Sequence, residues 1–214
     1  MKTKIILIFV LFASTIIGFA QQTSIGITVG SGTGWMSNTG QHVVHKESCN
    51  VGATFMYSTQ THWGFAADIK YSREGYKHNY DGTLAYEGKK MDERVSSDFI
   101  RVPLRVIYFF NDNSHNVRPN ISVGPSFGFL TGGKIRNEDD NTIYTKTPVK
   151  NAYNSFDFGV QGTVGLSFKL RDALWLSTDV AYYHGFLTQN TYGSNNMMNR
   201  NLVLNLGLRI GVGK

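Results

Sequence analysis

The chain has 214 residues, of which 41% are hydrophobic and 13% aromatic, with 23 glycines and four prolines. Its net charge is +6, and no cluster of Lys and Arg interleaved with aromatic residues is present, so the composition excludes the basic face of a nucleic-acid-binding protein. Its single cysteine, Cys49, excludes an intrachain disulfide, and we interpret it as an inert thiol. Plentiful glycine and aromatic residues with few helix signals favour an all-β chain.

The N-terminus has the layout of a secretory signal peptide. Lys2 and Lys4 precede an apolar run from Ile5 to Ile17, and Gly18-Phe19-Ala20 places small residues before a cleavage site. We therefore expect a signal peptide over residues 1–20, cleavage near Ala20, and a mature chain over residues 21–214 with 19 basic and 15 acidic residues. The alternative is an uncleaved N-terminal anchor. However, the run is short of the roughly 20 apolar residues that a membrane helix needs, and no later stretch has that length.

Alternation of apolar and polar residues recurs along the mature chain with a period of two, which is the pattern of β-strands. Each segment can cover the roughly 9–11 residues of a tilted membrane strand, whereas ordinary strands have about 5–6. The eight predicted strands lie at about residues 25–30, 50–57, 63–72, 100–108, 120–129, 156–169, 174–182 and 201–212.

The connections between these segments alternate in length. Three are short, at 58–62, 111–117 and 171–172, and four are long and polar, at 36–47, 76–97, 131–154 and 186–199. Tight periplasmic turns and long outer loops are typical of bacterial outer-membrane barrels. We predict an all-β fold: a single eight-stranded antiparallel up-and-down transmembrane β-barrel, located in the outer membrane of a Gram-negative cell and surrounded by its lipid.

The charges on the polar face indicate that the apolar face points outward. On a lipid face, an Arg or Lys near the membrane midplane costs about 2–4 kcal/mol. Inside a barrel the charges can pair, and glycines on the same face leave room for them. We expect Asp68 to pair with Arg101 or Arg105, and Asp179 to pair with Arg209. The predicted lumen charge network consists of Asp68, Lys70, Arg101, Arg105, Asp157, Lys169, Asp179 and Arg209.

Aromatic residues gather near the predicted strand ends on the apolar face. Such placement is typical of the aromatic girdles at the two membrane interfaces. The alternative is a soluble, lipocalin-like periplasmic carrier in which these rings fill an apolar lumen. The predicted girdle consists of Tyr57, Trp63, Tyr71, Tyr108, Phe110, Phe168 and Tyr182.

The segment Phe99–Phe110, with sequence FIRVPLRVIYFF, resembles a strand of the PorT-like, porin-family outer-membrane β-barrel domain, and Pro119–Pro125 resembles the strand that follows it. The resemblance covers nearly the whole mature chain. It implies an eight-stranded membrane barrel without catalytic residues, and it permits an accessory role in secretion.

The last predicted strand is similar to the assembly signal that the barrel-insertion machinery reads, which makes that machinery an expected partner. The signal is a polar residue, a glycine and spaced hydrophobic residues, and it ends on an aromatic residue that Lys214 replaces here. The matching residues are Asn205, Gly207, Ile210 and Val212.

Two groups of residues are candidates for metal binding. His42, His45 and Cys49 are Zn²⁺ ligand types, but their spacing is irregular and no fourth ligand is evident. The acidic run Glu138-Asp139-Asp140 has the oxygen ligands of a weak Ca²⁺ site. We interpret both as solvated loop segments and expect no metal and no cofactor.

Nucleophile chemistry and phosphate binding have equally weak signals. His184 shares a predicted strand with Ser177 and Asp179, but alternation places it on the opposite face, so the three cannot readily form a catalytic triad. Ser31-Gly32-Thr33-Gly34 has neither the lysine nor the following helix of a phosphate loop. We therefore expect no catalytic residue and no enzyme.

Three roles remain compatible with a small barrel of this kind. The first is a structural or surface-interaction role in which the long outer loops bind an extracellular ligand or protein. The second is a narrow porin-like channel, although side chains mostly fill the interior of eight strands. The third is the accessory role in secretion that the resemblance permits.

Overall fold

The computed structural model describes residues 22–37, 43–59, 61–79, 92–112, 114–139, 142–190 and 196–212. The predicted signal peptide and its cleavage site lie outside these residues, and no helix of the described part is long and apolar enough to cross a membrane. The elements are β1 (Gln22–Ser37), β2 (Val43–Ser58), β3 (Trp63–Asn79), β4 (Asp92–Phe109), β5 (Val117–Asp139), β6 (Thr142–Pro148), the 3-10 turn η2 (Val149–Asn151), β7 (Phe156–Lys169), β8 (Leu174–Thr188) and β9 (Met198–Val212).

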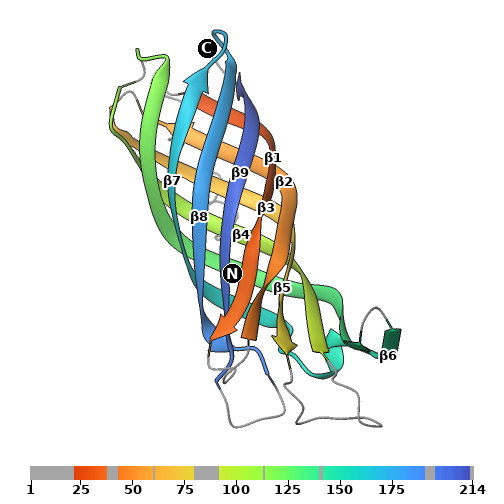
Figure 1. Cartoon of the computed structure of the whole chain (residues 1–214). Coiled ribbons are helices and arrows are strands. Elements are labelled where there is room, and N and C mark those ends of the chain that lie inside the picture. The colour runs from red at the N-terminus through yellow and green to blue at the C-terminus, as the bar shows by residue number, and fades with distance from the viewer. Residues whose placement is uncertain are drawn as a thin grey trace, which may run out of the picture.

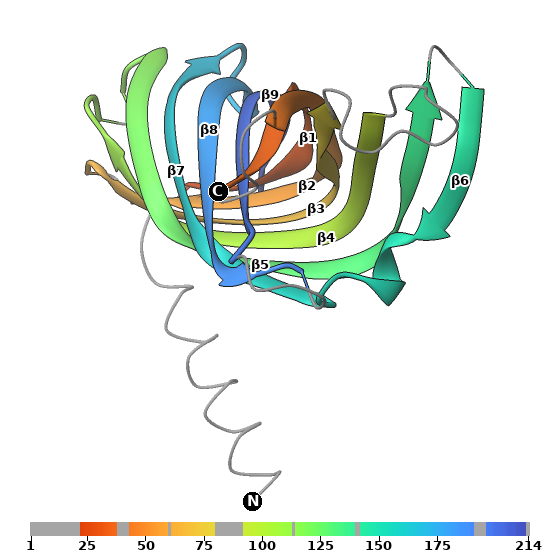
Figure 2. The same ribbon diagram turned by 60° about the horizontal axis from the view of Figure 1, so that its bottom comes forward.

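Eight of these strands close into an antiparallel barrel, which confirms the predicted fold (Figure 1). Within the described part, the hydrogen-bonded order is β4-β3-β2-β1-β9-β8-β7-β5, and a β4–β5 pairing closes the ring. The ninth strand, β6, pairs only with the far end of β5 and extends from the barrel as a hairpin (Figure 2).

The two ends of the barrel differ in construction. Thr23 of β1 pairs with Val212 of β9, so the start and the end of the described barrel lie together, at the same end as the tight turns between β2 and β3, β4 and β5, and β7 and β8. The hairpin of β5 and β6 lies at the opposite end (Figure 1). This arrangement agrees with the alternation of short and long connections in the sequence.

The strands run further into the predicted long loops than the alternation indicated. Strands β1 and β2 reach Ser37 and Val43, β3 and β4 reach Asn79 and Asp92, and the region 131–154 contains the end of β5, all of β6 and η2. The predicted boundaries 36–47, 76–97 and 131–154 were therefore wrong. In this region the outward side chains of β3 and β4 are polar, whereas inward ones such as Tyr76 and Val95 are apolar, so backbone pairing continues where the apolar-outward alternation has ended.

Most apolar side chains of the barrel point outward, and most polar side chains point into the lumen. Val123 is 56% exposed and Leu204 54%, whereas Asp68 is 1% exposed and Asp157 is fully buried. The lipocalin-like alternative is therefore wrong, because it needs the apolar face inside. We call the outward apolar residues of the eight barrel strands the apolar belt. Its most exposed members are Ile25, Ile27, Val51, Trp63, Phe65, Ile69, Val123, Phe129, Val164, Phe186, Leu204, Leu206 and Ile210.

Gly75 on β3 occupies a backbone conformation that a side chain would strain. Its φ angle is +145°, and a Cβ atom would overlap the carbonyl of Val95 on β4. We expect Gly75→Ala to lower the free energy of unfolding by about 1–3 kcal/mol. The measurement is the urea midpoint of the refolded protein in detergent. Gly132→Ala is the control, because a Cβ there meets only the Asp98 carboxylate at 3.8 Å; equal midpoints for the two variants would contradict the expectation.

Candidate functional site

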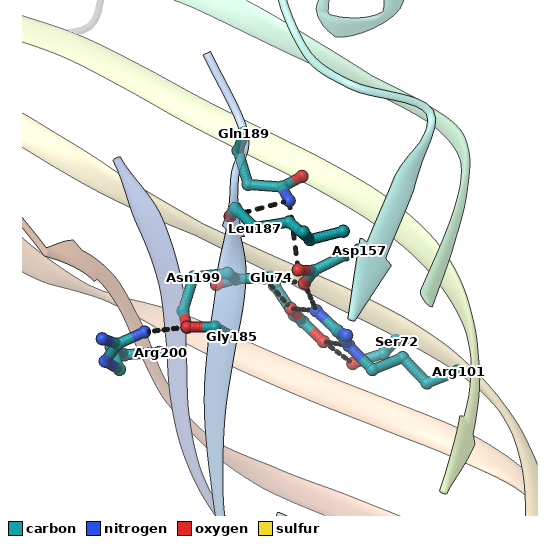
Figure 3. A network of polar contacts seen from close by, with 9 residues as sticks. All are labelled: Ser72, Glu74, Arg101, Asp157, Gly185, Leu187, Gln189, Asn199 and Arg200. Atoms are coloured by element: carbon teal, nitrogen blue, oxygen red, sulfur yellow. Dashed lines mark hydrogen bonds and ion pairs between the residues drawn. The ribbon is translucent and has the colours of Figure 1, made fainter. Parts of the chain in front are cut away.

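Between the two ends of the lumen, nearer the hairpin end, lies a buried ion cluster in which Arg101 contacts two carboxylates (Figure 3). Arg101 of β4 donates from Nε to Glu74 Oε1 at 2.6 Å and from Nη2 to Glu74 Oε2 at 2.7 Å. The same Nη2 donates to Asp157 Oδ2 on β7 at 2.7 Å. Glu74 and Asp157 are fully buried, so the guanidinium provides the compensation that two desolvated carboxylates require.

Amide side chains extend this cluster across the barrel (Figure 3). Asn199 of β9 donates to Glu74 Oε2 at 2.5 Å, although β2 and β1 separate the two strands in the sheet order. Gln189, which follows β8, donates to Asp157 Oδ1 at 3.1 Å. These contacts connect strands β3, β4, β7 and β9 through the interior of the barrel. We call Glu74, Arg101, Asp157, Gln189 and Asn199 the central layer.

A second ion cluster surrounds Asp68 of β3, nearer the turn end. Arg105 Nη2 lies 2.8 Å from Asp68 Oδ2, Lys70 Nζ lies 3.1 Å from the same oxygen, and Thr54 donates to Oδ1 at 2.7 Å. Of the two partners considered for Asp68, the structure places Arg105 against it, while Arg101 belongs to the central layer. Asp68, Lys70 and Arg105 are all buried.

Two expected members of the charge network have other partners. Asp179 accepts a hydrogen bond from Asn205 Nδ2 at 2.8 Å, whereas Arg209 donates to Ser24 Oγ at 3.0 Å and Ser167 Oγ at 3.1 Å. The predicted pairing of Asp179 with Arg209 was therefore wrong. Lys169 lies at the β7–β8 turn, 3.4 Å from the exposed Asp172, and so outside the buried clusters. Alternation predicts which face a side chain occupies but not its partner.

Apolar clusters close both ends of the lumen. At the hairpin end, η2 turns inward, and Tyr153 Oη lies 2.7 Å from Tyr76 Oη. At the turn end, the guanidinium of Arg118 lies 3.8 Å from the centre of the Phe109 ring and donates to Ser58 Oγ at 2.9 Å. The two clusters consist of Met36, Tyr76, Val95, Phe99, Leu130, Val149 and Tyr153 at the hairpin end, and Met56, Ala66, Ile107 and Phe109 at the turn end.

The polar cavities between these layers are small. Two of them, at Glu74–Arg101 and at Asp68–Arg105, measure about 30 Å³ each, and a third, beside Arg118 and Arg209, measures about 70 Å³. A site needs roughly 10–15 Å³ for one water molecule, so each can hold only a few waters. The described lumen is a packed polar core.

Glu74 and Arg118 are central to this core but were absent from the predicted network. Both continue the alternation of predicted polar faces, since Glu74 follows Asp68, Lys70 and Ser72 at steps of two, and Arg118 precedes Asn120. The predicted strands ended too early to include them. Extending the period-two pattern by two or three residues would have found both.

The predicted girdle residues lie on the outer face in two zones. At the turn end, Trp63 and Tyr108 make an edge contact with ring centres 5.1 Å apart, and Tyr108 contacts Phe110 at 5.5 Å. Toward the hairpin end, Tyr182 lies 6.2 Å from Trp35. The remaining predicted members, Tyr57, Tyr71 and Phe168, also lie on outward positions of their strands.

The candidate metal and catalytic residues do not converge in the described part of the chain. His45 packs its ring against Trp35 at 4.9 Å, Cys49 is exposed, and His42 lies outside the described residues, as do Asp140 and the side chains of Glu138 and Asp139. His184 contacts Tyr182 and Phe186 on the outer face, away from Ser177 and Asp179. No group of three His, Cys, Asp or Glu side chains there could hold a metal ion.

The sequence profile described as "Outer membrane protein beta-barrel domain" matches residues 19–191, which is most of the chain. The chain belongs to this family. It is therefore an outer-membrane protein whose apolar belt lies in the lipid bilayer. Bacterial outer-membrane barrels place short turns in the periplasm and long connections outside, so we expect the turn end to face the periplasm and the hairpin end to face outward.

Two solved structures share the barrel fold of this outer-membrane protein. OprG from Pseudomonas aeruginosa is 12% identical with a TM-score of 0.53, over 91% of this chain and 96% of that chain. A major outer membrane protein from Thermus thermophilus is 13% identical with a TM-score of 0.53, over 89% and 99% of the two chains. A comparison with curated protein sequences gives no significant match.

Proposed function

We propose that this outer-membrane protein is a closed membrane anchor that presents an extracellular binding surface. The observation that carries the proposal is the central layer, which joins β3, β4, β7 and β9 through the lumen between two apolar ends. Ion flow would require these buried charges to separate, which is costly in a low-dielectric interior. The interior therefore supports rigidity rather than transport.

The extracellular end supports the binding part of this proposal. Strands β3, β4 and β5 continue as paired sheet beyond the apolar belt, and β5 pairs with β6 from Lys134–Pro148 to Asp139–Thr142. A paired sheet holds its side chains more rigidly than an open loop does, which lowers the entropic cost of recognition. We infer that the described rim of β3–β6 is part of the surface that a partner meets.

Two finer assignments are proposals that rest on resemblance. The PorT-like pattern of Phe99–Phe110 covers the second half of β4 and the residue after it, and it supports an accessory role in secretion. On β9, Asn205 is buried while Ile210 and Val212 are exposed to lipid, which supports recognition of this strand by the barrel-insertion machinery. If cells in which the gene is deleted secrete proteins as the wild type does, the secretion role is contradicted.

The test of the closed anchor is single-channel recording of the refolded protein in planar bilayers. We expect no unitary conductance steps from the wild-type barrel, because the central layer and both apolar clusters block the lumen. Heat-modifiable gel mobility establishes that the recorded protein is folded. Regular conductance steps from the folded protein would favour the narrow channel instead.

The test of the binding surface is a shortened hairpin. Residues 138–144 are replaced by Asn-Gly, a two-residue turn suited to hairpins, and cells that carry either protein are applied to immobilised glycans and surface proteins. We expect the shortened protein to fold and to lose a binding interaction that the wild type has. Equal binding by both proteins across the panel would contradict a role for the hairpin.

A further inference from the structure

A row of four cations crosses the outer face of β3–β6, beyond the apolar belt. The strand registers place Lys77 opposite Arg94 and Arg94 opposite Arg136. They also place Lys146 of β6 opposite Arg136. Like charges directly opposite one another repel, so a carboxylate or a bound anion beside this row lowers its energy.

A hollow of about 600 Å³ adjoins this row on the outer wall. It lies at the bulge of β2, where the pairing with β3 shifts between His45 and Cys49. Lys46 from this bulge donates to Ser96 Oγ on β4 at 2.6 Å, and Ser96 lies opposite Gly75, whose lack of a side chain lets the lysine reach across β3. The residues that line the hollow include Ser31, Lys46, Glu47, Arg73, Lys77 and Arg94.

Cations outnumber carboxylates among the described side chains here. Arg73 has Asp98 at 2.8 Å and Lys77 has Asp92 at 2.7 Å. Lys46 lies outside the apolar belt, and burial together with the charges of Arg94 and Arg73 lowers the pKa of its ammonium group to about 8. The charges of Lys134 and Arg136 likewise contribute to lowering the pKa of Lys146 on the hairpin.

The position of these cations relative to the apolar belt indicates which kind of anion they can bind. On β3 the belt ends at Tyr71, and Arg73 is the next outward residue; on β4 it ends at Ile100, and Asp98 and Ser96 follow. Outward residues on one strand are about 7 Å apart, so the cations begin within one or two such steps of the lipid-facing side chains. That level is the headgroup layer of the outer leaflet, because the first and last described residues of the barrel and the tight turns lie at the opposite, periplasmic end.

We propose that this surface binds the phosphate groups of a phosphorylated glycolipid in the outer leaflet. We call Lys46, Arg73, Lys77, Arg94, Arg136 and Lys146 the cationic rim. Arginine presents a planar pair of donors that matches phosphate geometry, and lysine adds a compact positive charge. The glycolipid's acyl chains lie along the apolar belt while its phosphates occupy the hollow and the row. The inference does not depend on whether the lumen conducts.

The test measures glycolipid retention by the full-length mature barrel, refolded in a neutral detergent and observed by native mass spectrometry. The probes are lipid A bearing phosphate and the same lipid A after enzymatic dephosphorylation. Two variants are used, Lys46→Gln with Arg94→Gln in the hollow, and Arg136→Gln with Lys146→Gln in the row. The control, Lys150→Gln with Arg171→Gln, removes two exposed cations and leaves the rim intact.

We expect retention of the phosphorylated lipid only, with affinity lowered roughly fivefold for each rim cation removed. We expect the control variant to match the wild type, and about 0.5 M salt to weaken binding. Equal retention of the two lipids, or equal losses in rim and control variants, would overturn the proposal. So would capture of soluble dextran sulfate without retention of glycolipid, which would identify a polyanion site. Heat-modifiable mobility verifies folding, and either rim variant alone suffices for the test.

Discussion

Replacing Arg101 by methionine is expected to lower the free energy of unfolding by about 3–5 kcal/mol. The substitution removes the one guanidinium that contacts both Glu74 and Asp157, and it leaves two fully buried carboxylates without that cation. Removing one partner of a buried ion cluster costs far more than the intact cluster contributes, because the remaining charges stay desolvated. The measurement is urea unfolding of the refolded barrel, followed by tryptophan fluorescence and by the boiling-dependent gel shift.

Two controls separate charge burial from loss of packing. Neutralising the whole cluster, as Glu74→Gln, Arg101→Met and Asp157→Asn together, should recover much of the stability because no unpaired charge remains. Arg73→Gln removes a half-exposed pair with Asp98 and should change stability by no more than about 1 kcal/mol. A triple variant as unstable as Arg101→Met would mean that side-chain volume, rather than charge pairing, accounts for the loss.

An arginine placed in the middle of the apolar belt is expected to cost about 2–4 kcal/mol. Val123 is suited to this test because it is the central outward residue of the lipid-facing part of β5 and is 56% exposed. Because the new side chain points away from the lumen, it causes no steric conflict there. The loss of unfolding free energy therefore measures how unfavourable a charge is in the medium around this position. The measurement is the unfolding free energy of Val123→Arg in lipid bilayers.

Val117→Arg provides the matched control on the same strand and face. Val117 lies at the periplasmic edge of the belt, where the side chain can reach the interface and the expected cost is about 0–1 kcal/mol. Equal costs at the two positions would contradict a membrane boundary between them. The pair therefore tests the position of the belt independently of the lumen.

The number of barrel strands and the orientation of their faces were predictable because lipid contact and a polar core impose a strict period of two. From Trp63 to Tyr71 each outward residue is apolar, and from Asp68 to Glu74 each inward residue is polar. The ends of the strands were not predictable from this pattern. Beyond Tyr71 both faces of β3 carry polar residues, and only the backbone pairing with β4 shows that the strand continues to Asn79.

The sequence predicted which residues of the candidate site point into the lumen, but it did not predict which of them contact each other. Alternation located Asp68, Arg101, Arg105 and Asp157 on the inner face, where the structure buries them. It could not show that Asn199 reaches Glu74 across the lumen, since that contact joins residues 125 positions apart and depends on the stagger of the strands. The inward turn of η2 was equally invisible, because its apolar residues have no period.

The seam between β1 and β9 has a consequence for the order of assembly. It pairs Thr23 with Val212 and continues to Ser37 with Met198, so the first strand gains this neighbour only after nearly the whole polypeptide exists. Until then the edge of β1 offers unpaired amides and carbonyls to any other extended chain. Contacts between residues so distant in sequence also form slowly. A protein arrested before β9 would therefore remain an open sheet prone to aggregation. Ring closure pairs the edge of β1 with β9 and removes this template for intermolecular pairing.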